Sequence, residues 1–387
     1  MKSKVLSILI LVIASSLFNQ CVKTDAPVLP LVSVAGATQE RKVTVSEFEF
    51  NVSLDRAVTS DASFDYATSS GTAEADKDFT SSSGTLIIPA GKQSTSIKIQ
   101  VKGDSTRKVN QTFFLDISNP KNCSLVTNRL LGTIVNENGS YLPIDNGGFS
   151  TPKAYAGYTL IWSDEFDKTS VNTDNWTYES GNNNGWGNHE LENYTGRTQN
   201  SFVSQGNLII EARPESFGGS NYTSARMVTK EKKTFKFGRV DIRAKLPKGK
   251  GIWPALWMLG NNIDEAGWPT CGEIDIMELV GNESGKVYGT LHWGPVHQSA
   301  GGNYSLPSGI FNDEFHVFSL VWDVGSIKLY IDNLLYFTHD ISGSNSPFAR
   351  NFFFIFNVAV GGDWPGAPDG TTPFPQRMVV DYIRVFQ

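Results

Sequence analysis

Short stretches in which apolar and polar side chains alternate with a period of two recur along the chain, and this is the pattern of half-buried β-strands. Clear examples lie within residues 43–54, 97–101, 240–246 and 327–331. No amphipathic helical pattern longer than about three turns stands out. The chain also has 36 glycines among its 387 residues, as expected for many turns. The sequence therefore predicts an all-β protein.

Tryptophan and histidine divide the chain, because all nine Trp and all five His follow residue 161. A length of 387 residues has room for two domains. We predict one β-sandwich over residues 27–137 and a second over residues 158–387. Residues 138–157 are rich in Gly, Pro, Asn and Ser and are predicted to be a linker.

The N-terminus, residues 1–20, has the order of a secretory signal. Lys2 and Lys4 precede an apolar core, residues 5–18, that is too short for a permanent membrane span. Cys21 follows at a position that resembles the lipidation site of a bacterial lipoprotein, although residues 18–20 depart from the usual pattern. We expect a lipid-anchored protein of the cell envelope, at the outer membrane or cell surface, with secretion as the alternative.

Residues 272–281, GEIDIMELVG, place three carboxylates in a stretch that otherwise has the composition of a buried strand. Glu273 and Asp275 share one strand face, whereas Glu278 is out of phase. An extra residue near Ile276, a β-bulge, would return Glu278 to that face. Two glutamates beside one cleft suit retaining glycoside hydrolysis, in which two carboxyl groups stand about 5 Å apart. Solvated surface acids are the alternative, but the apolar neighbours indicate only one polar face.

The stretch from Trp268 to Gly281 resembles the active-site strand of glycoside hydrolase family 16 in its bulged form. Further matching motifs are YTSARMVT (222–229), FGRVDIRAKLPKGKGIWPALWMLG (237–260), TLHW (290–293), NVAVGGDWPG (357–366) and VDYIRVFQ (380–387). Together they resemble the laminarinase-like members, which act internally on β-1,3-glucan. The resemblance implies a concanavalin-like jelly roll, with Glu273 as nucleophile, Glu278 as acid/base and Asp275 as a modulating residue.

A glucan groove needs aromatic rings to stack on sugars and polar groups to bond hydroxyls. The resemblance assigns these roles to Asn188, Glu190, Tyr194, Arg226, Trp253, Trp257, Trp268, His292, Trp293, Asn357 and Trp364. Trp253 and Trp257 are four residues apart, so they share a strand face. The side to which His292 points depends on the strand register. Three other tryptophans are predicted to lie in the core: Trp162, Trp176 and Trp322.

Calcium is the metal that the resemblance suggests, with a structural role and with Glu165, the carbonyl of Gly206 and Asp381 as ligands. Ordinary salt bridges are the alternative. Catalysis should need no cofactor. The net charge of −6 argues against nucleic acid as a partner, so a neutral polysaccharide substrate is favoured, and we expect a monomer.

Residues 64–101 resemble part of a Calx-β domain, an immunoglobulin-like sandwich that often binds calcium through acidic loops. Those loops are depleted here, and Asp76, Asp78 and Asp104 are the only obvious oxygen ligands. We therefore favour a spacer or interaction module without strong calcium binding. Cys123 and Cys271 fall in different predicted domains, so no disulfide framework is implied.

Two other classes of function compete with a hydrolase: a carbohydrate-binding protein without catalysis and an adhesion scaffold. Neither needs three mutually repelling acids on one strand face, so a hydrolase is favoured. Among its substrates, β-1,3-1,4-glucan, agar, carrageenan and porphyran are alternatives to β-1,3-glucan. Sulfated galactans call for basic groove residues, and Arg226 is the main one that the motifs provide.

Overall fold

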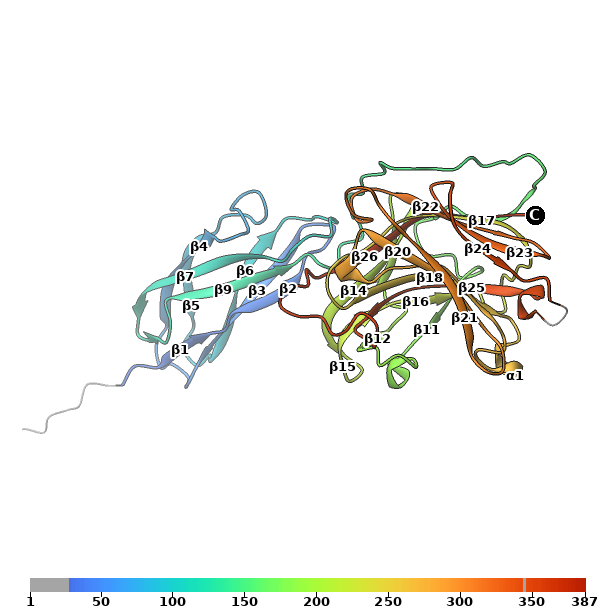
Figure 1. The fold of residues 1–387 in the computed structure, drawn as a ribbon. Coiled ribbons are helices and arrows are strands. Elements are labelled where there is room, and N and C mark those ends of the chain that lie inside the picture. Colours follow the sequence, from blue (N-terminus) through green and yellow to red (C-terminus); the bar gives the residue numbers. More distant parts are fainter. Residues whose placement is uncertain (1–27, 344–345) are drawn as a thin grey trace, which may run out of the picture.

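The computed structural model describes residues 28–343 and 346–387, so the signal segment and Cys21 lie outside the described residues. Two β-sandwiches follow one another along the chain (Figure 1). In the part of the chain that the structure describes, helices are limited to α1 (Ile263–Ala266) and the 3-10 turns η1 (Asn183–Gly185), η2 (Gly281–Glu283) and η3 (Pro347–Ala349). The predicted all-β fold class is confirmed. Within the described ranges, no helix has the length and apolar character needed to cross a membrane.

The first sandwich packs a sheet of order β6-β3-β1-β8 on a sheet of order β2-β9-β7-β4-β5. Alternate residues of β3 enter its core, where Phe48 and Phe50 contact the ring of Phe113 from β7. This alternation is the one read from the sequence. The strands are β1 (Leu31–Val34), β2 (Ala37–Glu40), β3 (Ser46–Leu54), β4 (Ala62–Ser70), β5 (Ser83–Ile88), β6 (Ser94–Val101), β7 (Gln111–Lys121), β8 (Ser124–Leu125) and β9 (Arg129–Val135).

The second sandwich has a ten-stranded sheet of order β12-β15-β14-β26-β17-β22-β23-β24, to which β10 and β13 are joined. Its members are β10 (Leu160–Asp164), β12 (Glu192–Tyr194), β13 (Ser201–Ser204), β14 (Asn207–Phe217), β15 (Ser220–Ser224), β17 (Gly238–Lys245), β22 (His316–Trp322), β23 (Ser326–Ile331), β24 (Leu334–Asp340) and β26 (Gln376–Phe386).

The opposing sheet has seven strands in the order β11-β16-β25-β18-β19-β20-β21. They are β11 (Thr177–Glu179), β16 (Arg226–Val228), β18 (Ile252–Gly260), β19 (Glu273–Glu278), β20 (Lys286–Trp293), β21 (Gln298–Ser305) and β25 (Phe352–Val360). On β18, Leu256 and Met258 point into the core between the sheets, whereas Trp253 and Trp257 point to the opposite face. The seven-stranded sheet thus has one apolar face and one face free for a binding site.

Two of the three tryptophans that were predicted to lie in the core are fully buried there, Trp176 and Trp322. Trp162 lies at the edge of the same core, where its ring packs against Phe235 and Phe354.

Residues 138–157, the predicted linker, cross the second sandwich and are held on it by hydrogen bonds (Figure 1). Arg243 donates to the carbonyl of Phe149 at 2.6 Å, and the Thr151 N–H donates to the Tyr382 hydroxyl at 2.8 Å. Leu142 and Ile144 pack on a small apolar cluster of the same sandwich. The Gly, Pro, Asn and Ser content of this segment therefore reflects its lack of strands. It does not mean that the segment lacks contacts with the second sandwich.

One arginine of the first sandwich is buried in the second. The Arg107 guanidinium is 3.1 Å from Glu211 on β14, donates to the carbonyls of Thr198 and Gln199, and covers the ring of Phe202. Both members of the Arg107–Glu211 pair are almost fully buried. The two sandwiches are therefore joined by an ion pair that solvent screens little.

Candidate active site

The strand β19 contains the predicted bulge, which brings Glu278 into phase with Glu273 and Asp275. On β18, Asp275 lies opposite Trp257 and Glu278 lies opposite Ala255, so three steps along β19 match two along its neighbour. The same shift occurs against β20, between the partners of Asp275 and Glu278. Ile276 and Met277 both remain in the core. The extra residue returns Glu278 to the face that carries Glu273 and Asp275.

All three carboxylates line one cavity of about 350 Å³ on the free face of the seven-stranded sheet. Its walls are the predicted residues Asn188, Glu190, Arg226, Trp253, Trp257, Trp268, Glu273, Asp275, Glu278 and Asn357, joined by Trp186, Gly187, Ala255, Leu259 and Ala359. Aromatic rings and polar groups therefore surround the acids, which is the composition that a sugar-binding groove needs.

An indole N–H is bonded to each of the two glutamates. Trp268 donates from Nε1 to Oε2 of Glu273 at 2.7 Å, and Trp253 donates from Nε1 to Oε1 of Glu278 at 3.0 Å. Each hydrogen bond fixes one carboxylate oxygen of its glutamate. The same indoles line the cavity.

Burial and mutual repulsion raise the pKa values of the three acids. Burial, with the negative charge of Asp275, raises the pKa of Glu273 to about 8. Burial, with the charge of Glu273, raises the pKa of Glu278 to about 7. Asp275 has a pKa well above its usual range, because it is buried and faces Glu278. The cluster therefore retains protons near neutral pH, as an acid catalyst requires.

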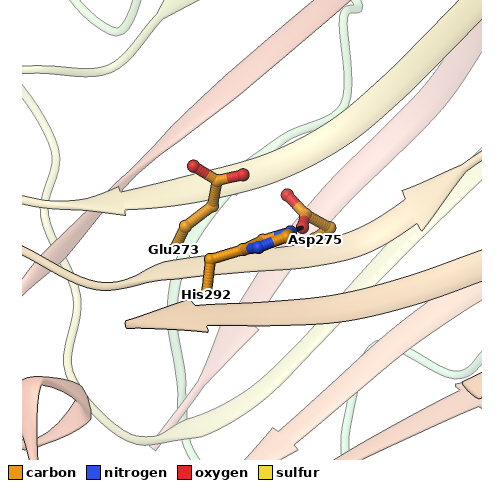
Figure 2. A group of neighbouring side chains, drawn as sticks. All are labelled: Glu273, Asp275 and His292. Carbon is orange, nitrogen blue, oxygen red and sulfur yellow. Dashed lines mark ion pairs between the residues drawn. The ribbon is translucent and has the colours of Figure 1, made fainter. Parts of the chain in front are cut away.

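The side chain of His292 lies beside Glu273 and Asp275 (Figure 2). Its Nε2 is 3.3 Å from Oδ2 of Asp275, and its Nδ1 is 2.9 Å from Nε2 of His297. His292 pairs with Glu273 across β20 and β19, which settles the register that the sequence left open. Glu273, Asp275 and His292 offer ligand atoms within 4.8 Å of one another and are a possible metal group, although acid–base chemistry already accounts for both carboxylates.

Comparison with known proteins identifies the two parts of the chain. The model of the glycosyl hydrolases family 16 matches residues 187–384, and that of the Calx-beta domain matches residues 30–135. The chain belongs to glycosyl hydrolase family 16. Its second sandwich is accordingly a glycoside hydrolase domain.

Several relatives of this family 16 chain are named as glucanases. It is 42% identical over 271 residues to the glucan endo-1,3-beta-glucosidase A1 of Niallia circulans, covering 62% of this chain but only 39% of that protein. It is 41% identical over 248 residues to the beta-glucanase of Rhodothermus marinus, covering 59% of this chain and 85% of the relative.

A solved structure agrees with the fold of the family 16 domain. The laminarinase catalytic domain from Thermotoga maritima MSB8 is 51% identical, with a TM-score of 0.57, and the match covers 59% of this chain and 98% of that one. Together with the Calx-beta match, this confirms the predicted order of an immunoglobulin-like sandwich followed by a jelly roll.

Four residues that were predicted to bind substrate are absent from the lining of the cavity: Tyr194, His292, Trp293 and Trp364. His292 and Trp364 lie beside the site, whereas Trp293 and Tyr194 lie away from the groove surface. Trp293 follows His292 on β20, so strand alternation turns its ring to the other side, where it packs near His339 and Phe348. Tyr194 is fully buried beneath the groove and donates a hydrogen bond to Glu190 at 2.8 Å. Both assignments to direct sugar contact are therefore corrected.

Trp364 stands next to the cavity without lining it. Its ring is 43% exposed and makes edge-to-face contacts with Trp253 and Tyr288, at centroid distances of 5.6 and 4.9 Å. This position suits a sugar that lies further along the groove than those at the three acids.

Trp186 is a groove residue that the sequence did not reveal as one. Its ring lies 4.8 Å from the Arg226 guanidinium, and the Trp257 ring lies at the same distance on another side. Arg226 also forms an ion pair with Glu179. The neighbouring motif residue Asn188 was the available signal, but loop residues have no period from which a direction can be inferred. Ala255 and Leu259, in contrast, could have been found by alternation from Trp253 and Trp257.

Two of the predicted calcium ligands, Glu165 and Asp381, form ion pairs with basic side chains. Asp381 pairs with Arg243 at 2.7 Å, and Glu165 pairs with both Arg384, at 2.8 Å, and Lys153, at 3.3 Å. These ion pairs fit the salt-bridge alternative, and a structural calcium held by Glu165, the carbonyl of Gly206 and Asp381 stays a prediction.

In the Calx-beta sandwich, arginine and lysine pair with two of the three acids that were considered as calcium ligands, Asp78 and Asp104. Arg41 is 3.1 Å from Asp78 and 3.6 Å from Asp104, and Lys108 is 2.7 Å from Asp104. Lys108 and the N–H of Thr106 lower the pKa of Asp104 to about 2, despite its partial burial. Two cationic side chains thus supply the charge that a bound cation would bring, consistent with the expectation of a module without strong calcium binding.

Proposed function

We propose that the family 16 domain hydrolyses β-1,3-glucan internally and with retention of configuration. The observation that carries the proposal is the bulge in β19, which places Glu273, Asp275 and Glu278 on one face of an aromatic-lined groove. The relatives named as endo-1,3-glucanases and laminarinase support the choice of glucan.

In the proposed first step, a carboxylate oxygen of Glu273 attacks the anomeric carbon and forms a glycosyl ester. Glu278 gives its proton to the leaving glycosidic oxygen as the carbon–oxygen bond breaks. In the second step Glu278 takes a proton from water, and the water oxygen displaces Glu273 from the anomeric carbon. Two inversions retain the configuration. The reaction uses carboxyl groups and water and requires no cofactor.

Asp275 supports this exchange by its position between the two glutamates. Its charge repels that of Glu278, so ionisation of one acid favours protonation of another. Glu273 must be ionised to attack. Trp268 and His292 stabilise its ionised form, but Trp253 and His292 do the same for Glu278, and the pKa of Glu273, about 8, lies above that of Glu278, about 7. In the free groove, therefore, the proton is not yet held on Glu278. We propose that substrate filling the groove directs the remaining proton to Glu278.

The charge of the groove favours a neutral polymer. Among the described residues that line the cavity, Arg226 is the only lysine or arginine, and Glu179 neutralises its charge. A sulfated galactan would bring one or more sulfate groups into a site rich in carboxylates, at an electrostatic cost. Neutral glucan therefore fits the groove better than carrageenan or porphyran. Both β-1,3-1,4-glucan and agarose are uncharged too, so only a direct comparison of hydrolysis can separate them from β-1,3-glucan.

The test is incubation of the purified enzyme with separate polysaccharides and analysis of product size. Laminarin should yield a ladder of short oligosaccharides early in the reaction, as internal cleavage requires. Proton NMR of the first product should show the β-anomer. Clear release from agarose or carrageenan, with none from laminarin, would overturn the substrate assignment.

We further propose that the mature protein is anchored in the cell envelope through a lipid on Cys21. The motivation is the apolar core of residues 5–18 directly before this cysteine. Replacing Cys21→Ser should move the protein from the membrane fraction to the soluble fraction. A wild-type protein that is soluble, with an unmodified N-terminus downstream of Cys21, would show secretion instead.

A further inference from the structure

A second pair of acids lies beside the groove, on the segment that leads into β12. Glu190 lines the cavity, and Glu192, two residues later, is fully buried next to it. Glu192 belongs to none of the motifs that describe the catalytic cluster. A carboxyl group with no exposed surface needs a structural or functional reason, because an unpaired buried charge is costly.

Hydrogen-bond donors converge on Glu190 from the far wall of the groove. Trp257 donates to Asn357 at 2.8 Å, Asn357 donates to the Tyr194 hydroxyl at 3.0 Å, and Tyr194 donates to Oε2 of Glu190 at 2.8 Å. The amide of Asn188 donates to the other oxygen of Glu190 at 3.3 Å. Each donor in this chain is directed by the one before it, so Glu190 ends the chain as an acceptor.

Glu192 has far fewer donors. Its Oε2 accepts the N–H of Val360 at 2.6 Å. No donor among the described residues forms a hydrogen bond with its Oε1. The charged group that faces it is Glu190. Arg226, a cation whose charge acts on the neighbouring Tyr194, is already paired with Glu179. A protonated Glu192, in contrast, can donate to the Glu190 carboxylate, which lies within hydrogen-bond reach of its side chain.

We propose that Glu192 is a positioning residue that carries the one proton shared with Glu190 and holds the Glu190 carboxylate toward the groove as an acceptor for sugar hydroxyls. Burial and the charge of Glu190 raise the pKa of Glu192 well above its usual range, in agreement with a neutral side chain. Burial also raises the pKa of Tyr194 well above its usual range, so its hydroxyl remains a donor.

This inference rests on the proposed function, because it makes Glu190 part of the glucan-binding surface. Held by Tyr194, Asn188 and Glu192, the Glu190 carboxylate enters the groove already oriented, so sugar binding does not have to order it. Glu192 itself touches no substrate, since none of its surface is exposed. Its effect should therefore reach the reaction only through Glu190.

Two substitutions at this position separate the roles of proton and shape. Glu192→Gln keeps the length and a donor, and kcat/KM on laminarin oligosaccharides should stay within about threefold of wild type. Glu192→Met keeps the length without a donor, and KM should rise about tenfold, as expected for the loss of one hydrogen bond to a charged group, with a smaller change in kcat. Circular dichroism melting checks that both variants fold.

A double-mutant cycle distinguishes positioning from simple packing. If Glu192 acts through Glu190, then adding Glu192→Met to Glu190→Ala should cause little further loss. Additive losses, or a Gln variant as impaired as the Met variant, would overturn the proposal.

An infrared measurement needs no substrate and so stands apart from the proposed function. At neutral pH, the unliganded wild type should show the carbonyl stretch of a protonated carboxyl group that is missing from Glu192→Gln. The acids of the catalytic cluster are present in both proteins and cancel in the difference spectrum. An unchanged band would mean that Glu192 is ionised, and this result would reject the proposal even if laminarin is cleaved. If the Met variant does not fold, this spectrum and the Gln kinetics decide.

Discussion

Glu273 and Glu278 carry different parts of the proposed reaction, so their removal should have different chemical consequences. Glu278→Ala should lower kcat on laminarin by about a thousandfold, because the leaving oxygen loses its acid. An activated aryl glycoside should still form the glycosyl ester, and added azide should restore turnover with a β-azide product. Glu273→Ala, lacking the nucleophile, should instead give an α-azide by direct attack. NMR of the azide products checks both, and exchanged anomers would reverse the two roles.

The raised pKa of Glu273 should reduce the stability of the fold as pH rises. The folded protein holds a proton on this group up to about pH 8, whereas the unfolded chain releases it near the ordinary glutamate pKa of 4.5. Between these values the folded state binds more protons, so stability falls with increasing pH.

Glu273→Gln removes this effect and should raise Tm by about 3 °C at pH 8, with almost no difference at pH 4.5. Glu265→Gln, on the exposed face of α1, is the control and should show no such trend. Thermal unfolding across the pH range makes the comparison. An equal Tm for wild type and Glu273→Gln at pH 8 would contradict the proposed cost of burying this acid.

At the scale of elements, the bulge in β19 compensates for the odd spacing between Asp275 and Glu278. Deleting Ile276 removes the extra residue, so regular alternation would keep Glu278 on the groove face, two positions after Asp275. We expect the deletion variant to retain hydrolysis, with kcat within about a hundredfold of wild type, and to lose stability because one apolar side chain leaves the core. Deleting Ile276 and Met277 together is the control, since Glu278 would then follow Asp275 directly and turn into the core, and kcat should fall at least about a thousandfold. Equal activities of the two deletion variants would disprove the role of the bulge.

Strand periodicity explains what could be predicted of the site and what could not. Alternation placed Trp253 and Trp257 on one face, and the phase of Glu278 required the bulge that β19 contains. The same rule, applied once more, excludes Trp293 from the groove, but only after the register of His292 is known. Trp186 and His297 lie in connections between strands, where no period relates sequence position to direction. Their contacts could be learned only from the folded chain.

At the scale of the whole molecule, composition suggested two sandwiches joined by a linker and did not reveal how they interact. The contact depends on charged residues far apart in the sequence, Arg107 and Glu211, together with Arg213 and Glu137 at 2.8 Å. Such pairs leave no local pattern. Because the N-terminal sandwich supplies no residue of the groove, its effect on hydrolysis of short soluble substrates should be small, while its effect on stability should be larger.

Arg107→Ala tests this coupling between the sandwiches. The substitution leaves Glu211 buried without its partner from the first sandwich, although Arg377 still contacts it at 2.6 Å, so we expect a loss of about 2 kcal/mol in unfolding free energy. Arg129→Ala removes an exposed pair with Asp116 from the same sandwich and should cost less than about 0.5 kcal/mol. Denaturant unfolding compares the two variants, and activity on laminarin oligosaccharides at 25 °C should match wild type in both. Equal stability of the two variants would mean that the buried pair does not couple the sandwiches.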